Sequence, residues 1–152
     1  MSKIIANNKK AYRDYVVLET IEAGIELKGG EVKSLIDGRM SLDDGFARIE
    51  DNQVVLYNTH ISPYKEASYL NVEPTRPRKL LLRMKQILKL SGTLTQKGFT
   101  LIPLKVYFND NGFAKIELAL CKGKKFYDHR EDIKRRESDL EMRRAMKNRK
   151  RQ

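Results

Sequence analysis

Six short segments of the chain have the apolar, β-branched or alternating pattern of a β-strand. These segments are residues 15–18, 25–27, 45–49, 53–57, 99–108 and 113–120. Turn-forming residues separate three pairs of them, at Ala23-Gly24, Glu50-Asp51-Asn52 and Asn109-Asp110-Asn111-Gly112. The pattern predicts three antiparallel hairpins, and it places Pro103 at a sheet edge or a bulge because proline has no N–H for a strand ladder.

Two other segments have apolar residues at helical spacing. Residues 31–36 place three apolar side chains on one face, and Gly38 can end this short helix. A second helix is predicted from Arg76 onward, with Pro77 in its first turn. Its apolar positions are Leu80, Leu81, Met84, Ile87 and Leu88. Residues 60–77 hold three of the four prolines and are predicted to form a long surface loop.

These elements together predict a mainly β protein. Short strands in antiparallel hairpins, interrupted by two helices, favour a small closed β-barrel over a sandwich or a parallel sheet. A chain of 152 residues is long enough for one hydrophobic core and too short for two. We expect a barrel domain over residues 1–121 and a basic C-terminal tail over residues 122–152.

Positive charge is concentrated at the end of the chain. Residues 121–152 carry 13 Lys/Arg and 6 Asp/Glu, a net charge of +7 out of +11 for the whole protein. Such a segment repels itself and is stabilised by a polyanion, so it indicates an arm for nucleic acid. Phe126 and Tyr127 lie among the cations and suit base stacking. Opposite charges four residues apart contribute only about 0.2–0.5 kcal/mol each, so we expect the tail to be disordered alone and helical when bound.

Little in the sequence points to catalysis. Cys121 has no partner for an internal disulfide, and with His60 and His129 it does not make a set of zinc ligands. Nucleotide-binding and Gly-x-Ser-x-Gly motifs are absent, so we expect no enzymatic activity, no cofactor and no metal. With no apolar run near the roughly 20 residues of a membrane span and no secretory signal, we expect a cytoplasmic protein that does not contact membranes.

Composition alone leaves three other functions open. An unspecialised RNA-binding barrel would bind many RNAs alike, and a structural ribosomal protein would be present on every ribosome. An enzyme acting on nucleic acid could hold a metal with Glu22, Glu31, Asp43 and Asp44. The different settings of these carboxylates, on strand, helix and turn, weigh against that third function.

Several stretches, taken in order, resemble one protein family. They are Asn8-Lys9-Lys10-Ala11, Glu22-Ala23-Gly24-Ile25, Gly30-Glu31-Val32-Lys33-Ser34-Leu35, His60-Ile61-Ser62-Pro63-Tyr64, Arg78-Lys79-Leu80-Leu81-Leu82, Pro103-Leu104-Lys105-Val106-Tyr107-Phe108 and Lys122-Gly123-Lys124-Lys125. The chain is similar to the bacterial small protein B (SmpB) family from about Asn8 to Glu137. The resemblance implies an OB-like barrel of six antiparallel strands with peripheral helices, and no enzymatic activity.

The resemblance also implies a role in ribosome rescue by trans-translation. Members of the family bind the tRNA-like domain of transfer-messenger RNA, also called SsrA RNA. They help elongation factor Tu to deliver the aminoacylated RNA to stalled ribosomes, and their tail probes the empty message channel near the decoding centre. The expected partners are therefore this RNA, the ribosome and, through the RNA, elongation factor Tu. A one-to-one mimic of a tRNA arm favours a monomer.

By position, the RNA contacts of the family fall at Asn8, Glu22, Leu81 and Lys115. Each of the first three has an alternative explanation. Asn8 could be solvated in a polar arm, and Leu81 at helical spacing is more often a core residue. Glu22 would repel phosphate, so it could contact RNA only by accepting hydrogen bonds from base or sugar donors. Lys115, on the outward register of its strand, is plausible on physical grounds alone. Weaker candidates for contacts to the RNA backbone are Lys9, Lys10, Lys33 and Lys79.

The family's tail signature is expected to contact the decoding region of the ribosome. Its positions in this chain are Gly123, Lys124, Lys125, Tyr127, Asp128, His129 and Arg130. The family usually has lysine where His129 stands, so the charge at this position depends on pH. We expect Tyr127 to stack on a base.

Overall fold

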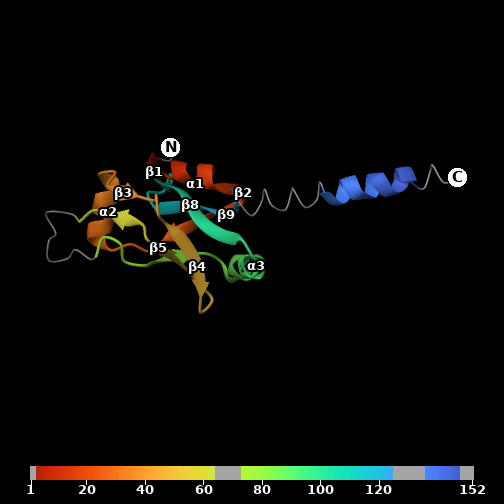
Figure 1. The fold of residues 1–152 in the computed structure, drawn as a ribbon. Helices are drawn as coiled ribbons and strands as arrows, with labels where there is room; N and C mark the ends of the chain where they lie inside the picture. Colours follow the sequence, from red (N-terminus) through yellow and green to blue (C-terminus); the bar gives the residue numbers. More distant parts are fainter. Residues whose placement is uncertain (1–2, 64–72, 125–135, 148–152) are drawn as a thin grey trace.

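The computed structural model describes residues 3–63, 73–124 and 136–147 (Figure 1). Six of its strands pair in a closed ring. The six are β2 (Tyr15–Ile25), β4 (Phe46–Glu50), β5 (Gln53–Tyr57), β7 (Arg78–Leu81), β8 (Phe99–Phe108) and β9 (Ala114–Gly123). The order around the ring is β8, β4, β5, β7, β2, β9 and back to β8, and every neighbouring pair is antiparallel. The predicted mainly β fold with six antiparallel strands is confirmed.

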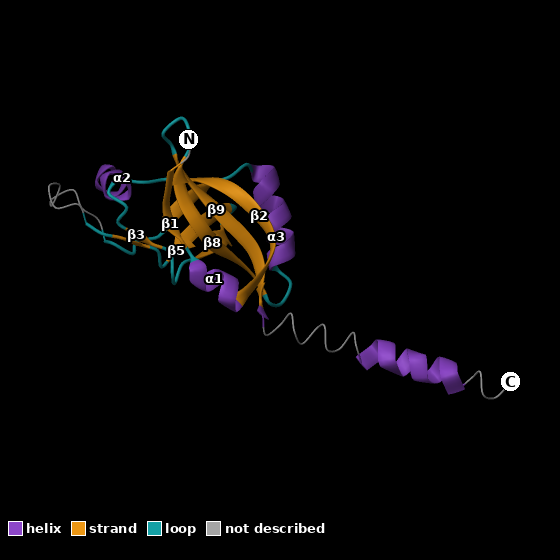
Figure 2. Ribbon diagram, turned by 90° about the horizontal axis from the view of Figure 1, so that it is seen from above, coloured by secondary structure: helices purple, strands orange, loops and turns teal. Residues whose placement is uncertain are grey.

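Further strands and helices surround this ring (Figure 2). They are β1 (Lys3–Asn7), α1 (Lys9–Asp14), α2 (Gly29–Ile36), β3 (Met40–Ser41), β6 (His60–Ile61) and α3 (Met84–Leu94). β1 pairs with β8, and β3 pairs with β6 in a small separate sheet. The prediction of irregular structure at residues 60–61 is therefore wrong, because a strand of two residues is too short to show a period.

The hydrophobic core fills the ring, and a smaller apolar cluster lies under α1. Ile116 and Leu118 of β9 are fully buried in the main core, whereas Ala119 and Cys121 pack with Ala11 of α1 in the smaller cluster. Cys121 donates from Sγ to the Thr100 carbonyl at 3.5 Å, and burial raises the pKa of its thiol to about 12. This is the inert setting expected of a structural cysteine.

Two β-bulges decide which side chains face outward. Pairing shifts by one residue in β2 between Val17 and Glu19, and in β8 between Pro103 and Lys105. The second bulge confirms the expectation for Pro103. Since successive strand residues point to opposite faces, one inserted residue exchanges the faces of all residues beyond it. Beyond the bulges, exposed Glu22 and partly exposed Tyr107 alternate with core positions.

The first predicted hairpin is wrong. Gly24 does not turn the chain: it lies within β2 and pairs with Lys115 of β9 on one side and Leu81 of β7 on the other. Glycine can mark either a turn or a place where another group approaches the backbone closely, and here it is the second. The other two hairpins, at residues 50–53 and 108–114, are confirmed.

The segment predicted as the start of the second helix is strand β7. Arg78 and Leu80 are buried whereas Lys79 and Leu81 are exposed, which is the alternation of a strand. Helix α3 begins only at Met84, where the Arg83 amide donates to the Gln86 side chain at 3.0 Å. Pro77 therefore precedes a strand and does not open a helix. The helical interpretation failed because arginine at position 78 was taken as a solvent-facing residue.

Arg78 is buried because it joins three parts of the chain. Its side chain has no exposed surface, and its Nε donates to the Glu31 carboxylate of α2 at 2.7 Å. Its other nitrogens donate to the carbonyls of Thr59 at 2.9 Å and Pro74 at 2.8 Å. Burial raises the pKa of Glu31, but hydrogen bonds from Arg76, the Lys28 amide and Arg78 outweigh it, and the net shift is downward. The carboxylate thus stays ionised and paired.

Residues 136–147 form a helix with every residue exposed. That the tail is disordered alone and becomes helical when bound stays a prediction. Opposite charges four residues apart, such as Asp139 and Arg143, favour the helical form without any packing against the ring.

We predict that Arg78→Met lowers the free energy of unfolding by about 3–5 kcal/mol, because it removes the fully buried one of the two arginines that pair with Glu31 and leaves the Thr59 and Pro74 carbonyls without this donor. Lys79→Met, one residue further on the exposed face of β7, should cost less than about 0.5 kcal/mol. Urea denaturation of both variants measures the difference. Equal stabilities would show that the buried ion pair does not hold β7 in place.

Candidate nucleic-acid interface

An open hollow of about 780 Å³ lies on the outside of the ring, where β2, β7, β9 and the start of α3 meet. We call it the β7 hollow. Four of the residues expected to contact RNA line it, namely Glu22, Lys79, Leu81 and Lys115. Strand pairing brings them together from distant parts of the sequence, because Gly24 of β2 lies between Leu81 and Lys115.

Gly24 forms the floor of the β7 hollow. An added Cβ at this position would lie 3.2 Å from the Cβ of Leu81, which is closer than most real contacts of this kind. Leu81 leans over the glycine and still has 52% of its surface exposed. The core explanation for Leu81 is therefore wrong. The missing side chain at Gly24 leaves room for Leu81 to pack on the sheet backbone at this point.

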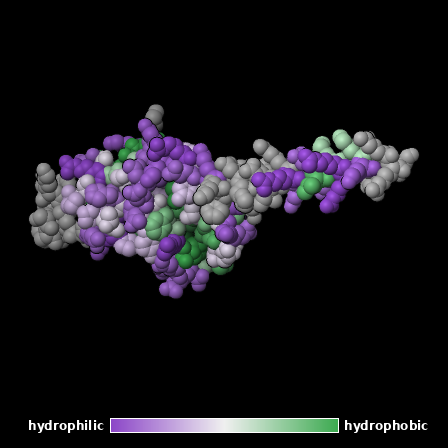
Figure 3. Space-filling model, viewed as in Figure 1, coloured by the Kyte–Doolittle hydropathy of each residue, from purple (hydrophilic) through white to green (hydrophobic). Residues whose placement is uncertain are grey.

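The β7 hollow combines positive charge with exposed apolar surface. Lys79, Arg83 and Lys115 line it together with a single carboxylate, that of Glu22. Leu81 and Met84, which line it, are more than half exposed. Leu88 of α3 is exposed outside the hollow, and Figure 3 shows an apolar area in the part of the molecule where Figure 1 places α3. Cations that attract phosphate beside apolar groups that contact bases or riboses are the combination that folded RNA requires. Arg83 and Met84 were not among the site residues expected from the sequence, because the helix was predicted to begin at Arg76 and not at Met84.

Two polar rows cross the outer face of β2, β9 and β8 at the rim of this hollow. Glu22 lies opposite Glu117, which lies opposite Lys105, and the Lys105 ammonium is 3.2 Å from the Glu117 carboxylate. Tyr107 lies opposite Lys115, and its hydroxyl donates to Oε2 of Glu22. Burial and the bond to Glu22 raise the pKa of the Tyr107 hydroxyl. The phenol therefore remains a hydrogen-bond donor.

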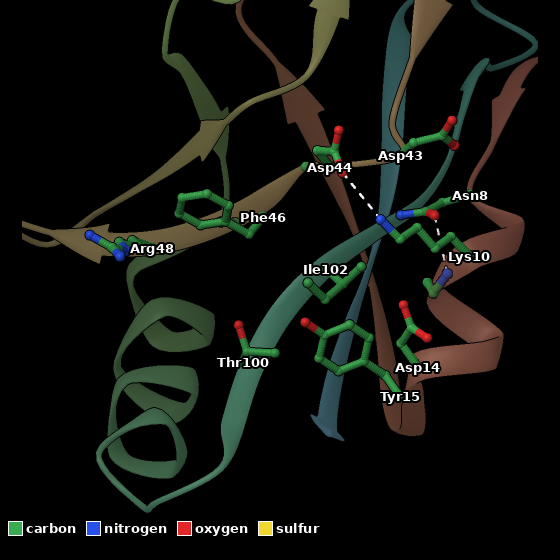
Figure 4. Close-up of a pocket in the computed structure, with 13 residues that line it drawn as sticks. Asn8, Lys10, Asp14, Tyr15, Asp43, Asp44, Phe46, Arg48, Thr100 and Ile102 are labelled. Atoms are coloured by element: carbon green, nitrogen blue, oxygen red, sulfur yellow. Dashed lines mark hydrogen bonds and ion pairs between the residues drawn. The ribbon is translucent and has the colours of Figure 1, made fainter. Parts of the chain in front are cut away.

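A second hollow, of about 420 Å³, lies between α1, β4 and β8 (Figure 4). We call it the α1 hollow. Lys10 reaches across it to Asp44, with 3.3 Å between Nζ and Oδ1. The charged residues that line it are Lys10, Arg48, Asp14, Asp43 and Asp44. Carboxylates outnumber cations here, so phosphate is less favoured than in the β7 hollow.

Asn8 is a structural residue and not part of a solvated arm. It is 2% exposed, and its Oδ1 accepts from the Ala11 amide at 3.1 Å as the N-cap of α1. Its Nδ2 donates to the carbonyls of Pro103 at 2.9 Å and Leu42 at 3.2 Å. These bonds give the amide a structural role in the ring, and its expected contact with RNA stays a prediction.

The other expected site residues are spread over the molecule. Lys9 is exposed on α1 and Lys33 on α2, and neither lines the β7 hollow. Gly123 is the last residue of β9, and Lys124, which follows it, is exposed. The remaining residues of the tail signature lie outside the described residues. They are Lys125, Tyr127, Asp128, His129 and Arg130.

The four carboxylates considered for a metal do not form one site. Glu31 is buried against Arg76 and Arg78, Glu22 lines the β7 hollow, and Asp43 and Asp44 line the α1 hollow. Within residues 3–63, 73–124 and 136–147, no three His, Cys, Asp or Glu side chains are grouped as metal ligands. None of the helices in these ranges has the length and apolar character needed to cross a bilayer.

The fold and the site define a class of protein: a small ring of antiparallel strands with a shallow cationic hollow and a basic tail, suited to binding an extended polyanion. The model of the SmpB protein family matches residues 5–148 of this chain. The chain therefore belongs to the SmpB family.

Similar proteins extend over nearly the whole chain. The SsrA-binding protein of Caldicellulosiruptor bescii is 57% identical over 145 residues, which cover 95% of this chain and 91% of that protein. The SsrA-binding protein of Enterococcus faecalis is 52% identical and covers 98% and 96%. A solved chain described as "tmRNA-SmpB: a journey to the center of the bacterial ribosome" superposes with a TM-score of 0.66 at 52% identity, covering 78% of this chain and 82% of that one.

We predict that Gly24→Ala displaces Leu81 and lowers affinity for the RNA ligand while the protein remains folded. The extra methyl would also cost about 1–3 kcal/mol of stability, as overpacking does. Leu81→Ala in the same chain removes the contacts with Cγ and Cδ1 but keeps the 3.2 Å contact with Cβ, so it should recover only part of this stability. Thermal denaturation of the single and double variants checks it. A Gly24→Ala protein as stable as the parent would mean that Leu81 does not pack on this glycine.

Proposed function

We propose that this protein binds the tRNA-like domain of transfer-messenger RNA and brings it to stalled ribosomes in trans-translation. The observation that carries the proposal is identity above 50% over nearly the full chain with proteins named SsrA-binding protein. A solved relative from a tmRNA-SmpB ribosome study supports it. Its partners are then the RNA, the ribosome and, through the aminoacylated RNA, elongation factor Tu. It acts in the cytoplasm as a monomer, by binding and without catalysis.

The proposal divides the work between two parts of the chain. Residues 1–121 grip the folded RNA, and residues 122–152 engage the ribosome. Two observations support a grip at the β7 hollow: three cations line it against one carboxylate, and its shape is built by rigid paired strands. Folded RNA is recognised by shape, which a flexible arm cannot provide. Lys122 and Gly123 are the last residues of β9 and pair with Val16 and Tyr15 of β2, so the ring extends two residues beyond position 121.

Within the ring, we assign direct contacts to Glu22, Lys79, Leu81 and Lys115. Asn8 acts indirectly by capping α1. Lys9, Lys10 and Lys33 lie outside the β7 hollow and would meet the RNA backbone only where it extends over other faces. The tail signature, Gly123 to Arg130, contacts the decoding region of the ribosome in this proposal.

Replacing Lys79 and Lys115 with alanine in the full chain should weaken binding to a tRNA-like domain transcript at least about tenfold, or about 1.4 kcal/mol. Each lost phosphate contact should also lower the dependence of log K on log salt by about 1. Lys97→Ala is the matched control, because Lys97 is an exposed lysine outside the β7 hollow. Fluorescence titration at several salt concentrations measures both quantities.

The same titration separates the rival functions. Alanine at Tyr127, Asp128 and Arg130 should leave the affinity for this transcript within about threefold, a change of less than about 0.7 kcal/mol in binding free energy. The same substitutions should abolish peptidyl transfer on stalled ribosomes. Equal affinity of the parent for an unrelated folded RNA would indicate an unspecialised RNA-binding protein and would contradict the proposal.

A further inference from the structure

We propose that Tyr107 is a positioning residue for RNA recognition: its hydroxyl fixes the Glu22 carboxylate at the rim of the β7 hollow, where Glu22 accepts a hydrogen bond from a donor group of the RNA. The donor is a ribose 2′-hydroxyl or a base amino or imino group. This inference rests on the proposed function and adds a residue to its site.

The strand geometry brings the tyrosine to the glutamate. Tyr107 lies on β8 and Glu22 on β2, with β9 between them. The hydroxyl bonds to Oε2 of Glu22, so the phenol spans β9 beside Lys115 and Glu117. The other carboxylate oxygen, Oε1, remains able to accept a hydrogen bond, because an ionised carboxylate has about four acceptor sites.

Electrostatics explain why a tyrosine suits this task. Glu22 and Glu117 face each other across paired strands, an arrangement that like charges destabilise. Lys105 neutralises Glu117 at 3.2 Å. Tyr107 stabilises Glu22 with a neutral donor, which orients the carboxylate and leaves its charge in place. A lysine there would cancel the charge and compete with the RNA donor.

A charged carboxylate in a cationic hollow gives selectivity. Lys79, Arg83 and Lys115 attract any polyanion, but a carboxylate repels phosphate and accepts only from donors. Glu22 therefore favours an RNA that places a hydroxyl or amino group at this point over one that presents phosphate. Selectivity of this kind needs a fixed acceptor, since a mobile side chain would turn away from a wrong group.

One contact and one backbone feature hold the tyrosine itself. The Lys105 ammonium lies 5.7 Å from the centre of the Tyr107 ring, within reach of a cation–π interaction. The β8 bulge before Lys105 turns Lys105 and Tyr107 to the outer face, where without it they would point into the ring. The bulge, the lysine and the tyrosine thus act together on one carboxylate.

The experiment titrates a tRNA-like domain transcript with full-length variants. Tyr107→Phe removes only the hydroxyl and should weaken binding about two- to tenfold, the range for one hydrogen bond. Tyr57→Phe is the matched control: Tyr57 also donates to a glutamate, Glu50, at 2.7 Å, but neither residue lines the β7 hollow. It should leave affinity unchanged. Glu22→Gln should weaken binding at least as much as Tyr107→Phe.

The double variant separates positioning from a merely structural role. Because Tyr107 acts through Glu22, adding Tyr107→Phe to Glu22→Gln should cause no further loss of affinity. The salt dependence of Tyr107→Phe should match the parent, since no phosphate contact is lost. Its melting temperature should stay within a few degrees of the parent, as for most surface changes.

Three results would overturn the inference: parental affinity in Tyr107→Phe, an equal loss in Tyr57→Phe, or losses that multiply in the double variant. Failure of the parent protein to bind the transcript would be different. It would remove the proposed function, and the inference would fall with it.

Discussion

The buried ion pair between Arg78 and Glu31 fixes the part of the structure on which the binding surface depends. Arg78 has no exposed surface and is held by α2 and by the carbonyls of Thr59 and Pro74. Such a cation is stable only while all its partners are in place. Since strand residues alternate, burying the first residue of β7 turns Lys79 and Leu81 outward. A network in the interior thereby sets which side chains the proposed RNA-binding surface presents.

Two bulges and one glycine complete this surface. Before its bulge, each of β2 and β8 contributes residues to the small cluster under α1. Beyond the bulge the inner and outer faces are exchanged, and the outer faces of β2 and β8 carry Glu22 and Tyr107. Gly24 then keeps the floor of the β7 hollow low. Specific recognition in this account comes from rigid backbone features, whereas the basic tail supplies charge. The α1 hollow, richer in carboxylates, shows that positive charge is placed selectively on the ring.

The sequence predicted the architecture better than the register. Alternation and turn residues identified the second and third hairpins, and helical spacing identified α2, because these signals are local. That Gly24 lies within a strand and that Arg78 is buried both depend on partners distant in the sequence, which no local pattern contains. The same holds for Asn8, whose amide is consumed by Pro103 and Leu42. Resemblance to the family identified Glu22, Leu81 and Lys115 as candidate contacts. The role of Tyr107 could not be predicted from the sequence, because it depends on the bulge that brings this side chain to Glu22.

The central claim is that the outer face of β2, β7 and β9 binds the RNA. Chemical-shift mapping of the full chain, titrated with a tRNA-like domain transcript, tests it most directly. The account predicts shifts concentrated at residues 22–24, 79–84 and 115, and little change at residues 43–48 beside the α1 hollow. Shifts at residues 43–48 with none at residues 79–84 would contradict it.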